Sequence, residues 1–462
     1  MMNIHRKFGI AAAVDGHASA AAFAAISAAH KIALALVWST VAMGAIVFTE
    51  PAPFDVCALG LLVLLPALGL LRVTRALLAY VAITLVPVGC AFFAILAAID
   101  PSRSLTHTAV TLFLTLVSLT LAAFVAKAPA RHAQIICQGA VAAGVIAASA
   151  GLAGYLNLFP GAYDIFTLYG RVSGTFKDPN VFGASLVLPV IYLLHAVLVP
   201  GGRRKGLAAA GLLLLVAALL LSFSRGAWFG LAMAIAIFAY LSFVTAEHAG
   251  QRLRIVGGIG GAAIAGALLV VIALQFENVA SLLDERATLT QSYDEGPEGR
   301  FGGQVKAERL ILAHPLGLGA QQFDGFYHLE EAHNVYLSMF MNAGWLGGLV
   351  FGLMVAVTCV LGARHALQRT ETQSLFIVVY AVFVAHAFEG FVIDLDHWRH
   401  FQLLLALCWG LMLGDRIPLT ARAAIAIARQ RPARVLLECF TKTGTTLATQ
   451  AKSALSTGHM AS

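Results

Sequence analysis

The clearest indication of the fold class is the segment GLAAAGLLLLVAALLLSFSRGAWFGLAMAIAIFAYLSFVTA, residues 206–246. It contains two apolar runs, each close to the roughly 20 residues that cross the core of a bilayer as a helix. The only charged residue in the stretch is Arg225, which stands between the two runs. The stretch therefore predicts two membrane-spanning helices joined by a very tight turn.

The composition extends this prediction to the whole chain. Of the 462 residues, 60% are apolar and only 11% are Asp, Glu, Lys or Arg, whereas a soluble domain has roughly 25% charged residues. This excludes a soluble enzyme, a disordered protein and a secreted disulfide scaffold. The six scattered cysteines are typical of small buried hydrophobes. The net charge of +7 fits basic cytoplasmic loops, so we expect no nucleic-acid partner.

Windows free of Asp, Glu, Lys and Arg predict about twelve transmembrane helices, and the fold class is an all-α polytopic membrane protein. The windows are 32–49, 56–71, 76–99, 104–126, 132–163, 179–202, 206–224, 226–246, 255–276, 332–363, 372–388 and 400–414.

The charges predict the orientation. If the N-terminus is cytoplasmic, 21 of the 30 basic residues and 5 of the 23 acidic ones lie inside, as the positive-inside rule requires. Both termini are then cytoplasmic. The predicted parts are a cytoplasmic N-terminal tail (1–31), spans one to nine (32–276), a large outer loop with short helices (277–331), spans ten to twelve (332–417) and a basic cytoplasmic C-terminal tail (418–462).

Two outer segments beside span ends carry positive charge against this bias. One is Ser222–Gly226, which contains Ser224 and Arg225, and the other is 171–180, which contains Arg171, Lys177 and Asn180. Taken alone, the first segment fits a functional arginine and an arginine that merely snorkels to anchor a helix end equally well. The second alone favours a capped helix start with solvated charges, because Pro179 suits a first helical turn.

The large outer loop and the tenth span add further candidates. Arg300 precedes a helical pattern over 302–313 and Arg309 lies within it, and the sequence His314-Pro315-Leu316-Gly317 stops this helix. His333 and Asn334 stand at the mouth of the tenth span. We predict His333 in the first helical turn, where the positive end of the helix dipole lowers the pKa of the imidazole. A neutral imidazole near pH 7 can act as a general base.

Together these residues put several arginines and one histidine on the same face of the membrane. Arginine binds phosphate bidentately and stays charged, so the set suits a lipid-embedded pyrophosphate, with the histidine deprotonating an attacking hydroxyl. No acidic cluster with metal-ligand character accompanies them, and we expect no metal and no other cofactor. The one metal-like alternative, which we do not favour, is the group Asp394, Asp396, His397 and His400.

Five motifs resemble those of the O-antigen ligase and O-antigen polymerase superfamily of bacterial envelopes, which includes exopolysaccharide polymerases. They are RVSGTFKDPNVFG (171–183), LSFSRGAWFGLA (221–232), GRFGGQVKAERLILAHPLGLG (299–319), HNVYLSMFMNAGWLGGL (333–349) and DLDHWRHFQLLLALCWG (394–410).

The resemblance implies a metal-independent, inverting glycosyltransferase of the bacterial inner membrane, with an architecture like that of the C-type membrane glycosyltransferases (GT-C) and a periplasmic active site. The donor would be a glycan on undecaprenyl pyrophosphate. The acceptor would be lipid A–core for a ligase or a lipid-linked glycan for a polymerase, and a chain-length regulator or other assembly proteins are possible partners. The catalytic residues implied are Arg225, Arg300 and His333, and the substrate-binding ones are Arg171, Lys177, Asn180, Ser224, Arg309 and Asn334.

Three alternatives remain open at this stage. Many relatives have an aromatic residue about three or four positions after this arginine, whereas this chain continues Phe301-Gly302-Gly303-Gln304, so Arg286 or Arg309 could replace Arg300 as the functional loop arginine. A polymerase fits as well as a ligase, although we favour the ligase. In another class, a transporter or flippase for lipid-linked sugars fits twelve spans, but the sequence lacks its two-fold symmetry. A purely structural scaffold would leave the outer arginines and His333 unexplained.

Overall fold

The computed structural model describes residues 28–200, 204–275, 280–282, 296–297 and 299–415. The predicted tails therefore fall largely outside the described residues, and Arg286 falls outside them entirely. The described part is helical apart from one two-stranded antiparallel sheet. The first helix covers Ala28–Ala45 and ends in η1 (Met43–Ala45). The elements that follow are α2 (Pro53–Ala67), α3 (Arg75–Ala94), η2 (Ile95–Ala97), α4 (Pro101–Lys127), α5 (Pro129–Tyr155), α6 (Ala162–Phe166), β1 (Thr167–Leu168), β2 (Arg171–Val172), α7 (Pro179–Ser185), α8 (Val187–Leu198), α9 (Lys205–Leu220), α10 (Arg225–Thr245), α11 (Ala249–Ala273), α13 (Arg300–Ala313), α14 (Phe323–Phe326), α15 (Val335–Ala366), α16 (Gln373–Glu389) and α17 (Arg399–Gly414).

Each of the twelve predicted windows coincides with a helix or a helix pair in this set, so the all-α polytopic class is confirmed. Within the described residues, eight helical segments are long and apolar enough to cross a membrane, and shorter apolar helices accompany them. The count of twelve spans stays a prediction, because helices of 15 to 17 residues such as α2, α16 and α17 are below the usual spanning length of about 20.

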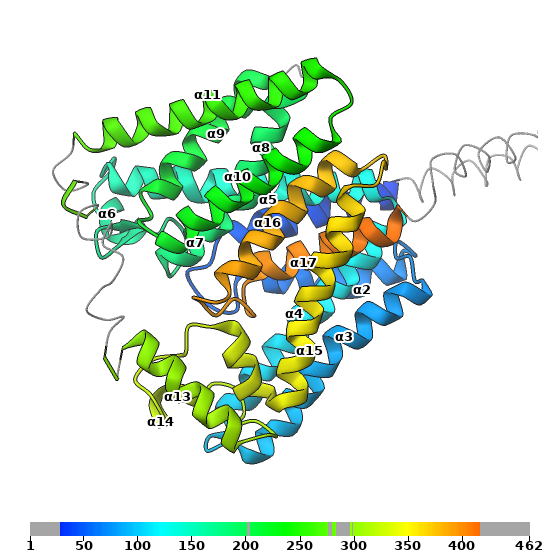
Figure 1. Cartoon of the computed structure of the whole chain (residues 1–462), viewed down its shortest axis with the longest axis vertical. Helices are drawn as coiled ribbons and strands as arrows, with labels where there is room; N and C mark the ends of the chain where they lie inside the picture. Colours follow the sequence, from blue (N-terminus) through cyan, green and yellow to red (C-terminus); the bar gives the residue numbers. More distant parts are fainter. Residues whose placement is uncertain (1–27, 201–203, 276–279, 283–295, 298, 416–462) are drawn as a thin grey trace, which may run out of the picture. The chain divides into compact units, whose positions relative to one another are not determined.

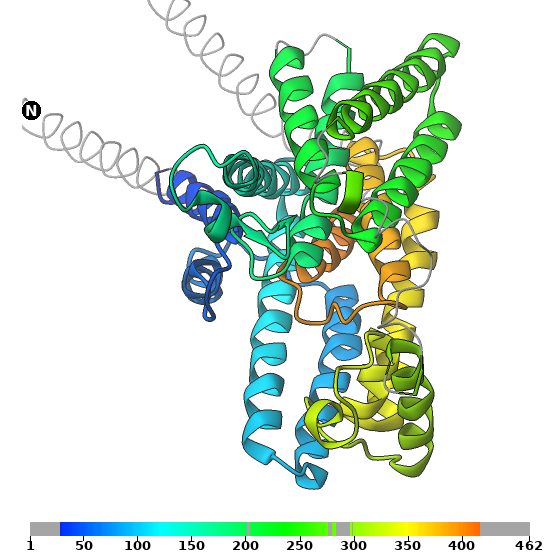
Figure 2. The same ribbon diagram turned by 90° about the vertical axis from the view of Figure 1, so that its left-hand side faces the viewer.

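Three helix pairs organise the interior of the described part. The pairs are α4 with α17, α3 with α15, and α10 with α16. Figure 2 shows α3 and α4 running side by side, and Figure 1 shows α16 and α17 in the middle of the bundle. The largest buried cluster of apolar side chains includes residues of most helices of the bundle, among them α4, α5, α8, α16 and α17. By contrast, only 6% of the apolar window of α11 is buried, so that helix contributes little to the core.

The predicted helix of the large loop exists as α13, and a glycine in α15 allows it to dock. Gly344 interrupts α15 with φ of 69° and ψ of −175°, a backbone region that is nearly exclusive to glycine. A Cβ atom there would lie 2.6 Å from the carbonyl oxygen of Pro315, whose chain segment passes directly over the kink. Trp345 N donates to that same oxygen at 2.9 Å. The segment that stops α13 is therefore fixed to the kink in α15.

A small apolar cluster completes this docking. Figure 1 shows α13 and α14 together beside one end of α15. The buried members of the cluster come from α13, from the segments that follow it and from α15, and they are Ala307, Leu318, Phe323, Ala332 and Met341. The Gln304 side chain on α13 also donates to the carbonyl oxygen of Ala332 at 3.4 Å. The first residue of α13, Arg300, is thereby brought close to the chain that leads into α15.

Candidate active site

Five segments that are far apart in the sequence surround one cavity of about 410 Å³. We call it the arginine cavity. All five segments lie in the parts of the chain that the charge pattern predicts on the outer face. The lining residues are Tyr169, Arg171, Asn180, Phe223, Ser224, Arg225, Gly226, Arg300, Glu330, His333, Glu389, Val392 and Ile393. The cavity thus brings together six of the residues that the sequence nominates: Arg171, Asn180, Ser224, Arg225, Arg300 and His333.

Arg225 is held at the cavity wall by the tight turn between α9 and α10. Ser224 is the N-cap of α10, and its hydroxyl accepts a hydrogen bond from Ala227 N at 3.3 Å. Such a cap satisfies one of the backbone N–H groups that a helix start leaves unpaired. The preceding residue, Phe223, has a left-handed backbone with φ of 48°. The tight turn that the sequence predicts is therefore present, and Arg225 is the first residue of the helix that follows it.

Arg171 ties two walls of the cavity together. It is only 7% exposed. Its Nε donates to the carbonyl oxygen of Ser222 at 2.8 Å, and its Nη2 donates to Oδ1 of Asn180 at 2.7 Å. The next residue, Val172, donates its backbone N–H to the carbonyl oxygen of Leu221 at 2.9 Å. The guanidinium of Arg171 consequently links the α9–α10 turn to the start of α7.

Arg300 enters the cavity from α13. It is the first residue of that helix, and its Nη2 donates to the carbonyl oxygen of Val392, in the segment between α16 and α17. Arg309 lies on the same helix but is exposed and does not line the cavity. Of Arg300 and Arg309, the two candidate loop arginines that the structure describes, Arg300 lines the cavity.

His333 lies before α15, not in its first turn, which corrects the sequence prediction. Asn334 is the N-cap of α15, and its Oδ1 accepts from Tyr336 N at 3.1 Å and Leu337 N at 3.3 Å. The helix therefore begins only at Val335, and Asn334 does not line the cavity. His333 instead has a left-handed backbone with φ of 48°, which turns its side chain toward the cavity.

The surroundings of His333 still favour a neutral imidazole. Burial lowers the pKa of His333, and the positive charge of Arg300 lowers it further. The carboxylate of Glu330 acts in the opposite direction, with its Oε2 lying 3.4 Å from Nε2 of His333. The predicted direction of the shift is thus the direction found, although burial and a neighbouring arginine replace the helix dipole as its main causes.

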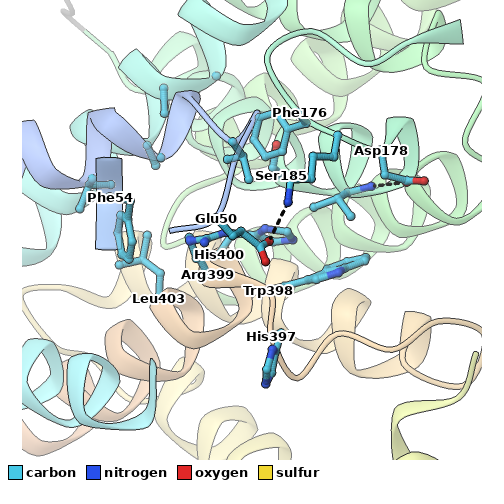
Figure 3. Close-up of a pocket in the computed structure, with 18 residues that line it drawn as sticks. Glu50, Phe54, Phe176, Asp178, Ser185, His397, Trp398, Arg399, His400 and Leu403 are labelled. Atoms are coloured by element: carbon cyan, nitrogen blue, oxygen red, sulfur yellow. Dashed lines mark hydrogen bonds and ion pairs between the residues drawn. The ribbon is translucent and has the colours of Figure 1, made fainter. Parts of the chain in front are cut away.

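Lys177 faces a different cavity, which has a volume of about 290 Å³. Its Nζ lies 3.8 Å from Oε1 of Glu50. Figure 3 shows Glu50, Arg399 and His400 close together in this second cavity, whereas His397 points away from them. Asp178 also lines the second cavity, and the side chain of Asp178 caps α7. The segment 171–180 therefore separates the two cavities.

The backbone is strained around the arginine cavity. Five non-glycine residues of the described chain have a left-handed backbone, and three of them, Tyr169, Phe223 and His333, line this cavity. Each such residue costs about 1–3 kcal/mol and persists only where its surroundings enforce it, most often at a functional site. The surroundings of the cavity therefore hold three residues in a backbone conformation that is costly for a residue with a side chain.

Glu389 is a lining residue that sequence reasoning missed. It is 2% exposed, and its Oε1 lies so close to α10 that a Cβ atom on Gly226 would come within 2.9 Å of it. Its Oε2 lies 3.4 Å from Nδ1 of His386. A charged residue directly after an apolar window was the available signal, since such groups are costly in a membrane and usually functional. Glu330 was missed as well.

The fold and the cavity first define a class: a polytopic α-helical membrane protein with a cavity lined by three arginines and a histidine. Comparison with known families then gives a more specific result, because the family model described as O-antigen ligase matches residues 210–352. Over these residues the predicted resemblance to the O-antigen ligase and polymerase superfamily is confirmed. The matched segment contains Arg225, Arg300 and His333. No curated protein matches the chain.

Proposed function

We propose that the protein transfers a glycan from undecaprenyl pyrophosphate to an acceptor hydroxyl, and that the arginine cavity is the active site. The observation that carries the proposal is the convergence of Arg171, Arg225, Arg300 and His333 on one cavity from separate segments. A cluster of guanidinium groups beside a half-buried imidazole combines an anion site with a base. The family description, O-antigen ligase, supports the same chemistry.

In the proposed reaction the acceptor oxygen forms a bond to the anomeric carbon on the face opposite the pyrophosphate. The bond from that carbon to the pyrophosphate oxygen breaks, and its electron pair leaves with the pyrophosphate. Arg225 and Arg300 stabilise the charge that develops there, as preorganised donors do in other transfer reactions. The displacement is direct, so the configuration at the anomeric carbon inverts.

His333 takes the proton of the acceptor hydroxyl in this scheme. Its lowered pKa keeps the imidazole neutral and able to accept, and the nearby carboxylate of Glu330 stabilises the imidazolium that forms. Arg171 acts mainly on the shape of the site, because its guanidinium is bonded to Ser222 and Asn180. Protein groups thus supply both the base and the charge stabilisation, and the scheme uses no metal.

The test is glycan transfer by the purified protein in detergent, with a lipid-pyrophosphate-linked glycan as donor. Arg225→Ala should lower the rate by about 100- to 1000-fold, as loss of one charge-stabilising donor does elsewhere. Arg225→Lys should fail as well, because an ammonium cannot replace the bidentate fork. Arg309→Ala is the matched control, since that arginine is exposed on the same helix as Arg300. Wild-type transfer by Arg225→Ala would refute the proposal.

We favour the ligase, with lipid A–core as acceptor, over a polymerase that extends a lipid-linked glycan. The acceptor assay separates them: a ligase needs lipid A–core, whereas a polymerase makes long chains from the lipid-linked repeat alone. The same assay tests the transporter alternative, because a transporter consumes no donor in detergent, where no compartments exist. We also propose the bacterial inner membrane, cytoplasmic termini and a periplasmic cavity, because the sorting of charges supports this orientation. A chain-length regulator is a possible partner.

A further inference from the structure

A second cluster of titratable side chains lies outside the arginine cavity. It joins His107, on α4, to Asp396 and His397, in the segment between α16 and α17. The ligand atoms of the three residues all lie within 4.8 Å of one another. Nε2 of His107 is 3.4 Å from Oδ2 of Asp396, and Nε2 of His397 is 3.9 Å from the same oxygen. Two distant parts of the sequence thus present three metal-ligating groups to one point.

The cluster is buried and incompletely paired. Asp396 is 7% exposed. Within the described residues, Oδ2 of Asp396 and Nε2 of His107 are buried atoms with no hydrogen-bond partner, although they lie 3.4 Å from one another. Buried polar atoms are rarely left without partners, and a site for an ion is one of the few explanations. A cavity of about 40 Å³, lined by His107 and Asp396, adjoins them, which is room for one water molecule.

We propose that His107, Asp396 and His397 bind a divalent transition-metal ion such as Zn²⁺. Two imidazoles and a carboxylate are ligands that Zn²⁺ accepts. Ligands about 2.0–2.1 Å from a tetrahedral Zn²⁺ lie roughly 3.3–3.4 Å from one another, close to the 3.4 Å between His107 and Asp396. The neighbouring cavity leaves space for water as the fourth ligand. Asp394 and His400, which the sequence groups with this cluster, are not members of it.

The ion competes with one existing contact. Oγ1 of Thr111 is hydrogen-bonded to Nε2 of His397 at 2.6 Å, and the rings of His107 and His397 stack with their centroids 3.7 Å apart. Binding requires the ring of His397 to turn toward Asp396 and to release Thr111. Removing the Thr111 hydroxyl should therefore strengthen metal binding, whereas it would destabilise a cluster that existed only for its hydrogen bonds.

The role of the ion would be structural, and it concerns the segment 390–398. This segment carries Val392, which accepts from Arg300, and Asp394, whose Oδ1 accepts from Ser338 Oγ at 2.6 Å. The carboxylate of Asp394 also accepts a hydrogen bond from the backbone N–H of His333. A metal ion that fastens Asp396 and His397 to α4 consequently holds in place the segment that positions Arg300 and His333. No step of the proposed transfer passes through the ion.

The experiment measures Zn²⁺ bound to the full chain in detergent, after removal of any polyhistidine tag, by equilibrium dialysis and elemental analysis. The wild type should bind one Zn²⁺ per chain. His107→Gln and Asp396→Asn should weaken binding by more than the roughly 10- to 100-fold that loss of an outer-shell partner costs. Thr111→Val should bind Zn²⁺ more tightly than the wild type, whereas His400→Gln and Asp394→Asn should bind it as the wild type does. His314→Gln controls for histidines elsewhere.

Thermal denaturation gives a second measurement that does not depend on transfer activity. Added Zn²⁺ should raise the melting temperature of the wild type and leave that of His107→Gln unchanged, because a ligand that binds only the folded state stabilises it. Absence of bound Zn²⁺ from the wild type would overturn the proposal. Equal Zn²⁺ content in the wild type and His107→Gln would overturn it as well, since His107 defines this site.

Discussion

Replacing Gly344 with alanine is the sharpest test of how the large loop is attached to α15. Gly344 has φ of 69° and ψ of −175°, so a side chain there costs about 1–3 kcal/mol in backbone strain. The new Cβ would also lie 2.6 Å from the carbonyl oxygen of Pro315. That backbone must move, which breaks the hydrogen bonds from Trp345 N to Pro315 O and from Leu318 N to Met341 O, each contributing about 1 kcal/mol.

The total predicted loss is about 3–5 kcal/mol of stability. Gly352→Ala is the matched control on the same helix, because a Cβ at Gly352 meets nothing within 4 Å. Alanine in a helix interior is more stable than glycine by roughly 0.5–1 kcal/mol, so Gly352→Ala should be neutral or stabilising.

The assay is thermal denaturation of the detergent-solubilised variants at equal protein concentration. Gly344→Ala should melt several degrees below the wild type and lose transfer activity, because Arg300 depends on the docking of α13. Gly352→Ala should match the wild type in both measurements. Equal melting temperatures for the two variants would show that the contact between the 314–319 segment and α15 does not hold the loop, and the reasoning would be refuted.

Three further predictions concern the cavity. The rate of transfer should fall as the pH drops through the lowered pKa of His333. Arg300→Gln should shift this fall in rate to higher pH, because removing a positive charge raises the pKa of the imidazole. A pH profile that Arg300→Gln leaves unshifted would contradict the assignment of His333 as the base. Arg171→Lys should destabilise the fold by about 1.5–3 kcal/mol through loss of its charged hydrogen bonds, measured by thermal denaturation, and a melting point like that of the wild type would exclude its linking role. Ser224→Ala should cost about 1 kcal/mol through loss of the helix cap yet lower the rate far less than Arg225→Ala, so comparable rate losses would assign Ser224 a direct contact with substrate.

The helices could be predicted from the sequence because their signal is local. A window without charge reveals a membrane helix directly, and caps such as Asp178 and Ser224 mark where helices start. The same locality explains why Arg225 and Arg171 could be nominated, since both stand at predicted span ends on the outer side. It also explains the error at His333. The apolar window gives the start of the helix only approximately, and the structure shows that the next residue, Asn334, is the N-cap of α15.

The remaining features depend on contacts between distant segments. Glu389 lines the cavity only because α16 packs against the glycine face of α10, where Gly226 leaves space for a carboxylate. His107 reaches Asp396 only through the packing of α4 against α17. The sequence around Glu389 or His107 does not indicate which distant residue each one contacts, so these contacts could be found only from the three-dimensional structure.

The way the arginine cavity is assembled sets a limit on dissecting the molecule. The family match covers residues 210–352, yet Arg171 and Asn180 precede that segment, and Glu389 and Val392 follow it. A fragment trimmed to the matched boundaries would keep Arg225, Arg300 and His333 while losing the residues that orient two of them. The segment that matches the family is thus shorter than the segment that forms the cavity. Expressed fragments should therefore include, and chimaeras between relatives should exchange, the whole region that lines the cavity.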